Sequence, residues 1–424
     1  MTIEDQIASL NDNVGTLVSK SDQLTTAIET KLNEYETWKE SIHKSNPVIL
    51  QVGADKEFTH PVDAINHINS HNLAGDIFWK IEIDPGIYEF PHNGVGELKF
   101  SHFKYVQIIG NTTNSSDVIF KHISNNHVWL IIGERNSHID VRNISFMGDI
   151  DITKNYIQSI IDRSLRSGMS GGGLSHGILA RHNSSFYVKN CNFNKLWHAI
   201  HCHYNCNMTI DDITASNIYG GAHATANCRI YITRSVFQGI GSGVYEDTSW
   251  AGLASFHNSS IFCYGMEIKD FHVGLYCHWS SDFHFHRAYD YDSDGVTKIN
   301  IKDGLIENCY HGIHTWYYSG GNINNSLVKN SQNNAIVVGQ SSNIHALENI
   351  IVDGAEIGYY VSHTSILAAN GSIARNCRNI GYYSAHKSEL HASNTTSNLS
   401  GNAVNYSPAI SHSLANSDSY IYIS

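Results

Sequence analysis

A repeat of about 23 residues constrains the fold of this chain more than any other feature. The sequence "IGYYVSHTS" begins at Ile357, and nearly the same sequence, "IGYYSAHKS", begins 23 residues later at Ile380. If the Gly of each copy is position zero, a Gly or Ala recurs at Gly177, Ala199, Gly221, Gly243, Gly274, Gly312, Ala335, Gly358, Gly381 and Ala403. Most steps are 22 or 23 residues, and two are longer, at 31 and 38. Such a period is typical of a solenoid whose insertions lie on one side.

We call each of these recurring Gly or Ala residues an anchor. The residues around each anchor indicate what the repeated unit is. Positions +1 and +3 are mostly apolar or small, as at Ile178 and Ala180, whereas +2 and +4 are more polar. This period of two predicts strands with one buried face. Asn or Asp also recurs four or five residues before the anchors, at Asn194, Asn217, Asp270, Asn308, Asn330, Asp353, Asn376 and Asn398. Because Asn and Asp tolerate left-handed backbone, this row predicts the same turn in successive coils.

These repeats resemble the right-handed single-stranded parallel β-helix of the pectin-lyase-like superfamily, and the resemblance covers most of 47–424. The N-terminal part of that region supports it. "VDAINHIN", from Val62 to Asn69, predicts a short helix that closes one end of the solenoid. "IEIDPGIYEF" followed by "YVQIIGN" predicts a strand, a Pro-Gly turn and two further strands. This order is similar to the entry module of many phage tailspikes.

The first 45 residues carry a different pattern, typical of a coiled coil. Ten of twelve seam positions are apolar or aromatic, at alternating steps of four and three: Ile3, Ile7, Leu10, Val14, Leu17, Ser21, Leu24, Ile28, Lys31, Tyr35, Trp38 and Ile42. A single helix lying on the β-helix is the other interpretation. The aliphatic seam favours two strands, whereas Tyr35 and Trp38 need a wider core. A stalk joined to a β-helix resembles phage tail fibres and tailspikes, which implies a homotrimer held to a virion tail or baseplate adaptor protein.

The expected fold class is therefore all-β, a right-handed single-stranded parallel β-helix with an N-terminal coiled-coil stalk. The expected domains are a stalk (1–45), an entry module and cap (46–150) and a receptor-binding body (151–424) with insertions near 245–262 and 280–298. The net charge of −12, without a basic run, disfavours nucleic acid, and no 18-residue apolar run predicts membrane insertion. The start carries no secretory signal pattern. The eight scattered Cys are expected as buried free thiols made in a reducing cytosol.

The outward positions predict where a ligand binds. Coils stack ~4.8 Å apart, so the +2 and +4 side chains would form rows of rings along one face. Flat rings cover the apolar faces of sugars, and imidazoles and phenols bond the hydroxyls. The candidate residues for an extended host surface polysaccharide are His201, His203, His223, Tyr245, Tyr276, His278, His314 and Trp316. The same row would also suit a contact between subunits of a trimer.

Both insertions carry carboxylates. Glu246 and Asp247 are the candidate acid and base of a glycoside hydrolase. In "DYDSDG", Asp290, Asp292 and Asp294 are candidate Ca²⁺ ligands, although the usual bidentate Glu position holds Ile301; a solvated acidic turn is the other interpretation. In "HCHYNC", strand alternation places Cys202 opposite His201 and His203, which disfavours zinc.

The motifs of known pectin-degrading enzymes are absent as sets. Asp211-Asp212 stands without the companion motifs of polygalacturonases, and there is no Arg-Pro-x-x-Arg run of pectate lyases. We therefore expect a homotrimeric tail fibre or tailspike, located in the virion tail and assembled in the host cytoplasm, that binds host glycan. A non-catalytic adhesin is favoured over a polysaccharide depolymerase on the same scaffold. A non-viral β-helix adhesin or a free carbohydrate-active enzyme is the further alternative.

Overall fold

The computed structural model describes residues 47–71, 78–90, 98–101, 105–123, 128–148, 175–241, 250–291, 298–392, 401–407 and 419–422. The chain divides into two units, of which one comprises 1–48 and 76–78 and the other 49–75 and 79–424. The second unit contains nearly all of the described residues. The predicted coiled coil (1–45) lies outside the described residues, so the stalk and the trimer stay predictions.

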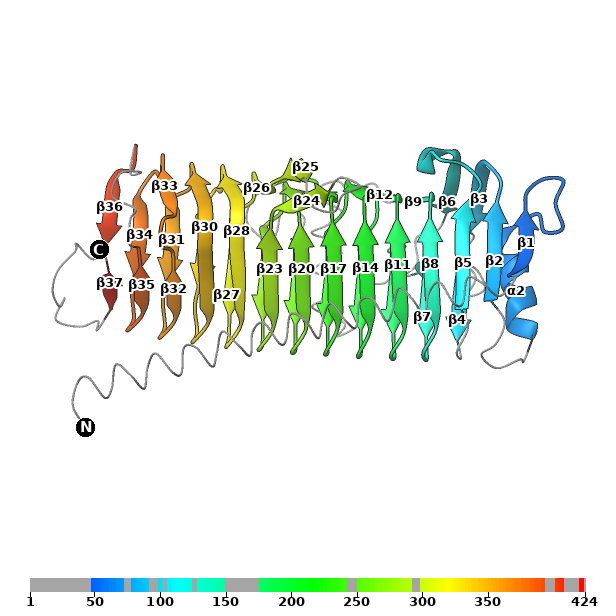
Figure 1. Cartoon of the computed structure of the whole chain (residues 1–424), viewed down its shortest axis with the longest axis horizontal. Helices are drawn as coiled ribbons and strands as arrows, with labels where there is room; N and C mark the ends of the chain where they lie inside the picture. Colours follow the sequence, from blue (N-terminus) through cyan, green and yellow to red (C-terminus); the bar gives the residue numbers. More distant parts are fainter. Residues whose placement is uncertain are drawn as a thin grey trace. The chain divides into compact units, whose positions relative to one another are not determined.

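Strands of the second unit recur in three columns that stack coil on coil (Figure 1). The first column contains β2 (Phe78–Ile83), β5 (Tyr105–Gly110), β8 (His138–Arg142), β11 (Ser185–Lys189), β14 (Asn207–Asp211), β17 (Arg229–Thr233), β20 (Ser260–Tyr264), β23 (Asp282–His286), β32 (Ile366–Ala368), β35 (Glu389–His391) and β37 (Tyr420–Tyr422). The second contains β3 (Gly86–Phe90), β6 (Val118–His122), β9 (Ser145–Met147), β12 (Asn192–Asn194), β15 (Thr214–Ser216), β18 (Val236–Gln238), β21 (Glu267–Lys269), β26 (Gly304–Glu307) and β33 (Ile373–Arg375). β28 (Gly320–Lys329) and β30 (Asn343–Asp353) run through both columns, and β1 (Val48–Val52) pairs with β2.

The third column forms a sheet of its own, which we call the twelve-stranded sheet. Its strands are β4 (Leu98–Ser101), β7 (Val128–Glu134), β10 (Ser175–Arg181), β13 (His198–His203), β16 (Gly220–Thr225), β19 (Ala251–Phe256), β22 (Val273–His278), β27 (His311–Trp316), β29 (Asn334–Val338), β31 (Ile357–Val361), β34 (Ile380–Ser384) and β36 (Val404–Ser407). Successive coils pair in parallel, so Ile178 faces Ile200 and Ile200 faces Ala222. An antiparallel hairpin, β24 (Ala288–Tyr291) and β25 (Lys298–Lys302), interrupts this pattern. The predicted parallel β-helix is thus confirmed.

The register of the stack corrects two anchors. Gly177, Ala199 and Gly221 align as predicted. In the next coil, however, Ala222 pairs with Leu253, so the anchor is Gly252 and the assignment of Gly243 was wrong. Tyr382 pairs with Tyr406, so the assignment of Ala403 was wrong as well. The step from Gly221 to Gly252 is 31 residues, against 22 for a regular step, so nine extra residues precede β19. The sequence period alone does not show whether such an insertion lies before or after a given strand.

Close packing between coils explains why the anchors from Gly177 to Gly381 are all Gly or Ala. The anchor and the next residue both face inward, as at Gly221 and Ala222, and both are buried. A Cβ on Gly221 would lie 2.0 Å from the carbonyl oxygen of Gly252, and one on Gly177 would lie 2.3 Å from that of Ala199. Only a very small residue fits against the neighbouring backbone, so the repeat seen in the sequence is a packing requirement.

Stacked rings and aliphatic side chains fill the interior. The rings of Phe146 and Phe193 stack with centroids 4.8 Å apart, and those of Tyr359 and Tyr382 do so at the same separation. All four side chains are buried. All eight Cys are free and buried, as predicted. The core is therefore a set of columns in which each residue contacts its equivalent in the next coil.

The predicted Asn/Asp turn is largely confirmed by left-handed backbone at Asn217, Asp270, Asn308, Asn330 and Asn376. Two members were assigned one residue too early. The left-handed residue is Lys195 (φ 53°) rather than Asn194, and Gly354 (φ 79°) rather than Asp353. Asn398 lies outside the described residues.

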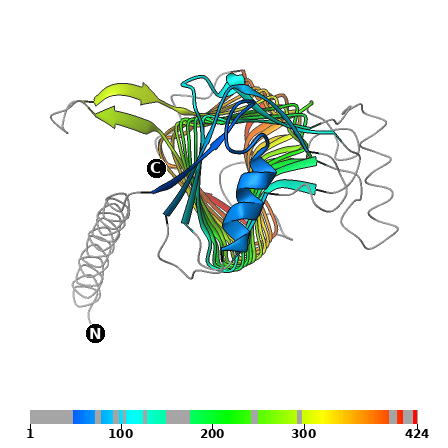
Figure 2. The same cartoon turned by 90° about the vertical axis from the view of Figure 1, so that its right-hand side faces the viewer.

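The predicted cap is helix α2 (Pro61–Ser70), which lies across one end of the coil stack (Figure 2). Its first turn is capped by the His60 ring, which accepts a hydrogen bond from the Val62 amide at 3.2 Å. Ala64, Ile65 and Ile68 form the buried face of this helix. The predicted strands after it are also present, as β2, β3 and β5. Within the described ranges, no helix is long and apolar enough to cross a membrane.

Candidate functional site

The structure brings most of the predicted ligand-binding residues onto the outer face of the twelve-stranded sheet. His201 faces His223, and Tyr276 faces His314, in one column of that face. His203, His278 and Trp316 lie two residues further along their strands, in a neighbouring column. Tyr245, Glu246 and Asp247 lie outside the described residues, so the candidate catalytic pair stays a prediction.

Burial divides this set into inner and outer residues. The side chains of His223 and His278 are 3% and 6% exposed, whereas the other five described residues are half-buried. Burial lowers the pKa of His223 to about 4 and that of His314 to about 3. These imidazoles are therefore neutral at pH 7, with one nitrogen that donates and one that accepts. The Nε2 atoms of both rings have no hydrogen-bond partner in the described part of the chain.

Aromatic neighbours that the sequence pattern did not single out complete this layer of rings. Trp129 stacks on His176 with ring centroids 4.2 Å apart. The Trp250 ring meets that of His223 edge-on at 4.9 Å. The inner part of the predicted row is therefore packed among other rings, and the surface that a ligand can reach lies nearer its edge.

The most accessible rings lie at a corner, immediately after the strands of the twelve-stranded sheet. We define the corner row as the aromatic residues at anchor position +5, one in each of seven coils: His182, Tyr204, His257, Trp279, Tyr317, His363 and His386. All seven have positive φ between 51° and 62°. Tyr204, Trp279 and Tyr317 are 47%, 46% and 40% exposed. Tyr and Trp rarely adopt left-handed backbone, whereas His does so more often, and the whole set recurs at one corner of the coil.

Six of the seven rings of the corner row stack in three pairs along the coil axis. The ring centroids of His182 and Tyr204 lie 5.4 Å apart and the rings are nearly parallel (2°), and those of His257 and Trp279 lie 4.6 Å apart at 22°. At the far end His363 and His386 stack at 4.6 Å. The row spans eight coil steps, or roughly 38 Å at ~4.8 Å a step, with gaps at two non-aromatic positions. It suits a long ligand better than a compact one.

A hydrogen-bonded column of small residues holds this corner in place. The Ser259 amide donates to Ser281 Oγ at 3.3 Å, and the Ser281 amide donates to Ser319 Oγ at the same distance. We call this column the corner ladder; its members are Cys206, Cys228, Ser259, Ser281, Ser319, Ser342, Ser365, Ser388 and Ser419. Because each rung satisfies a buried amide, the exposed rings project from a rigid backbone.

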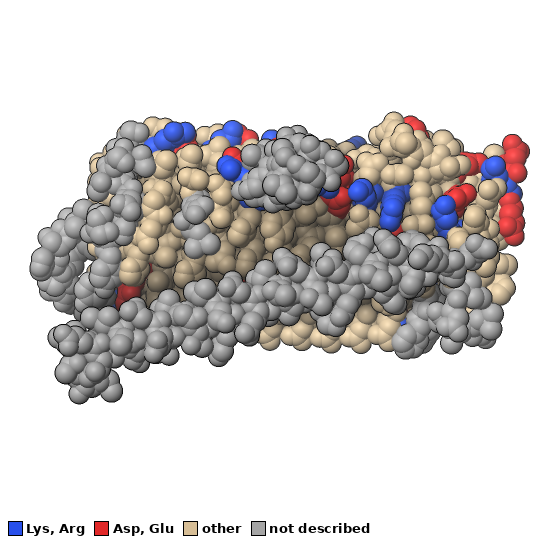
Figure 3. All heavy atoms as spheres, viewed as in Figure 1, with Lys and Arg blue, Asp and Glu red and all other residues tan. Residues whose placement is uncertain are grey.

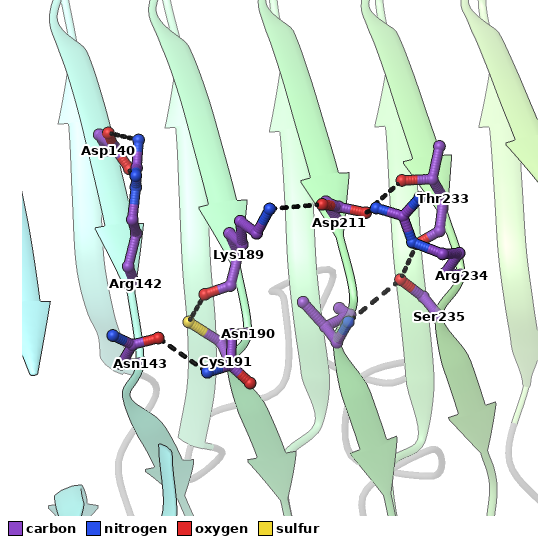
Figure 4. A network of polar contacts seen from close by, with 11 residues as sticks. Asp140, Arg142, Asn143, Lys189, Asn190, Cys191, Asp211, Thr233, Arg234 and Ser235 are labelled. Carbon is purple, nitrogen blue, oxygen red and sulfur yellow. Dashed lines mark hydrogen bonds and ion pairs between the residues drawn. The ribbon is translucent and has the colours of Figure 1, made fainter. Parts of the chain in front are cut away.

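A charged network occupies a different face, on the strands of the first column (Figure 4). The Asp211 carboxylate forms an ion pair with Lys189 Nζ at 3.1 Å. It also accepts hydrogen bonds from Thr233 Oγ1 and from the Arg234 guanidinium, at 2.6 Å each. Burial would raise the pKa of Asp211, but these hydrogen bonds and the positive charges lower it. Asp211 is thus ionised and surrounded by donors, which suits a structural ion pair rather than a general acid or base. Figure 3 shows Lys, Arg, Asp and Glu side chains mixed along one edge of this face, beside a broad uncharged area.

The structure also places the metal candidates. Asp290 lies in β24 of the antiparallel hairpin, while Asp292 and Asp294 lie outside the described residues, so the Ca²⁺ site stays a prediction. In "HCHYNC", His201 and His203 lie on the outer face, whereas Cys202 is in the core with no exposed surface. The strand alternation predicted for His201, Cys202 and His203 is therefore observed.

Comparisons with known proteins gave matches among solved structures alone. No protein-family model matches the chain, and no curated protein sequence does. The catalytic domain of an α-1,3-glucanase is 10% identical, with a TM-score of 0.44 over 90% of this chain and 69% of its own. A mutant periplasmic alginate epimerase is 10% identical (TM-score 0.42, 82% of this chain, 77% of its own). A Thermotoga maritima exopolygalacturonase is 8% identical (TM-score 0.41, 78% and 82%). All three are carbohydrate-active enzymes, and none of the three is more than 10% identical to this chain.

Proposed function

We propose that this chain binds an extended polysaccharide along the corner row. The observation that carries the proposal is the alignment of exposed rings, including Tyr204, Trp279 and Tyr317, over eight coil steps. Each ring offers a flat apolar face for a sugar ring, and the phenol and imidazole groups can bond hydroxyls. A rigid backbone beneath the rings reduces the entropy lost on binding.

The chemistry beside the corner row favours a ligand rich in hydroxyl groups. Burial lowers the pKa of His278 and of His201, to about 4 and about 3, so these neighbouring imidazoles are uncharged at pH 7. Neutral imidazoles donate and accept hydrogen bonds but do not attract anionic groups by charge. We therefore expect binding that depends weakly on salt, in contrast to binding through ion pairs.

The biological setting that we propose is a bacteriophage tail fibre or tailspike that attaches to host surface glycan. Support comes from the heptad pattern of residues 1–45 beside a β-helix, which suits a homotrimeric stalk bound to a tail or baseplate adaptor. Binding without cleavage is favoured because Asp211 and Asp140, in the charged network, are both occupied by ion pairs. Cleavage by Glu246 and Asp247 is the second candidate.

Replacing exposed rings tests the binding proposal. Trp279→Ala and Tyr317→Ala should each weaken binding to the best ligand of a glycan array by about tenfold, since loss of one stacked ring costs ~1.4 kcal/mol. Tyr231→Ala is the matched control, because Tyr231 stacks on Phe262 at 4.7 Å on the face of the first column, away from the corner row. If Tyr231→Ala weakens binding while Trp279→Ala does not, the corner row is not the site.

Three measurements test the setting and the chemistry. The mass of the chain in solution should equal three chains, and deletion of residues 1–45 should lower it. Incubation with purified host polysaccharide should leave the polymer length unchanged. Shorter products that disappear in Glu246→Gln would replace the adhesin proposal with the depolymerase. Binding to host cells that survives treatment removing their surface polysaccharide would contradict glycan attachment.

A further inference from the structure

Three thiols converge inside the coil beneath the corner row. The sulfur atoms of Cys202, Cys206 and Cys228 all lie within 4.8 Å of one another, and all three residues are buried. Cys202 points inward from β13, Cys206 follows the corner of the same coil, and Cys228 follows the corner of the next. The cluster is distinct from the glycan-binding surface proposed above, because its side chains face the core.

The hydrogen bonds of the corner ladder do not require cysteine at two of these three positions. Cys206 and Cys228 occupy the corner ladder, where the following coils use Ser259 and Ser281. The Cys206 amide donates to Cys228 Sγ at 3.4 Å, just as the Ser259 amide donates to Ser281 Oγ at 3.3 Å. A serine would therefore serve the ladder equally well. Sulfur in place of oxygen at two consecutive rungs, beside a third inward thiol, is what a thiophilic ligand would need.

Metal binding at this cluster would proceed by exchange of protons for the ion. Each thiol that coordinates a metal releases its proton to solvent, so a bound ion would be held by three thiolates.

We propose that Cys202, Cys206 and Cys228 bind one Cu(I) ion as three thiolates. A triangle with 4.8 Å edges has its centre about 2.8 Å from each corner (4.8 divided by √3), so small side-chain rotations reach metal–sulfur bonds of ~2.3 Å. Thiolates select soft ions such as Cu(I), whereas structural zinc takes four ligands. In the described residues the cluster contains these three thiols and no imidazole or carboxylate, which favours a three-coordinate soft ion over zinc.

Copper retention by matched variants tests this assignment. The full-length chain is loaded in two ways, by growth in copper-supplemented medium and by anaerobic refolding with Cu(I) added as its acetonitrile complex. The refolding route is included because the cluster is enclosed by the coil. After removal of loose metal with a Cu(I) chelator, copper and zinc per chain are measured by mass spectrometry, and thiolate-to-copper absorption is recorded in the ultraviolet.

The variants separate metal binding from folding. Cys228→Ser keeps an oxygen acceptor for the Cys206 amide, as in the other rungs, so it should fold. Its copper content per chain should be at most one tenth of that of the wild type. Cys277→Ser removes a buried thiol outside the cluster and should retain one copper per chain, as the wild type does. The proposal would be overturned if the wild-type chain held no copper by either route, or if it held zinc in place of copper. It would also be overturned if Cys228→Ser held as much copper as the wild type.

Discussion

Acidification should destabilise this fold steeply through its buried histidines, and His223 offers the clearest case. Its side chain is 3% exposed, and burial lowers its pKa from 6.5 to about 4. In the unfolded chain the imidazole takes up a proton near pH 6.5, whereas in the folded chain it stays neutral down to about pH 4. The unfolded state therefore binds more protons between these limits, and stability falls as pH falls.

The size of the effect follows from the two pKa values. A difference of 2.5 pKa units (6.5 minus about 4) corresponds to roughly 3 kcal/mol, because each unit is worth ~1.4 kcal/mol. The loss accumulates at ~1.4 kcal/mol per pH unit between pH 6 and pH 4.5 and is complete below pH 4. His314 and His201, in the same column, add to the slope in the same direction.

Urea titrations of the wild type and His223→Leu at several pH values between 4.5 and 7 measure this contribution. The free energy of unfolding of the variant should fall less steeply, by ~1.4 kcal/mol per pH unit. Val337→Ala is the control, because Val337 is 3% exposed in the same column and has no titratable group. This substitution should lower the free energy of unfolding by the same amount at every pH. Parallel profiles for the wild type and His223→Leu would refute the reasoning.

Packing and the corner ladder give further predictions, each checked by the urea midpoint. Gly221→Val should destabilise the fold by at least ~3 kcal/mol, because the new side chain would meet a backbone carbonyl. Gly86→Ala should be nearly neutral, because its Cβ would have no neighbour within 3.4 Å. Equal effects of the two substitutions would contradict the packing argument. Ser281→Ala should cost ~1–3 kcal/mol by leaving the Ser259 amide unsatisfied, and Ser281→Cys should restore most of it; a neutral Ser281→Ala would remove the ladder's role. Phe193→Ala should cost ~3–5 kcal/mol, and a smaller loss would mean that the core collapses around the cavity.

Much of the fold could be predicted from the sequence because coil stacking is a local rule. Alternation after each anchor fixes which side chains are buried, so Ile178 and Ile200 were placed correctly in the core. The cap helix expected from Val62 to Asn69 is observed as α2 (Pro61–Ser70). Registration after an insertion could not be predicted, since Gly243 and Gly252 satisfy the same pattern and only tertiary pairing selects Gly252.

The candidate site was predicted in part. His203 and Trp316 lie on the outer face as expected, but burial of His223 depends on neighbouring rings that no local pattern shows. Strand alternation does not predict the corner row, because position +5 follows the strand and Tyr and Trp seldom adopt left-handed backbone. The thiol cluster was missed because Cys228 comes from the next coil, 22 residues after Cys206. The sequence holds a signal for both features. Aromatic residues recur at position +5, and Cys206 and Cys228 are one period apart.

A structure of the chain with a bound oligosaccharide, chosen from the glycan array, would test the central claim most directly. The account predicts sugar rings lying against Trp279 and Tyr317, with the oligosaccharide running from coil to coil. An oligosaccharide bound on the face of the charged network instead, with the corner rings uncovered, would contradict it.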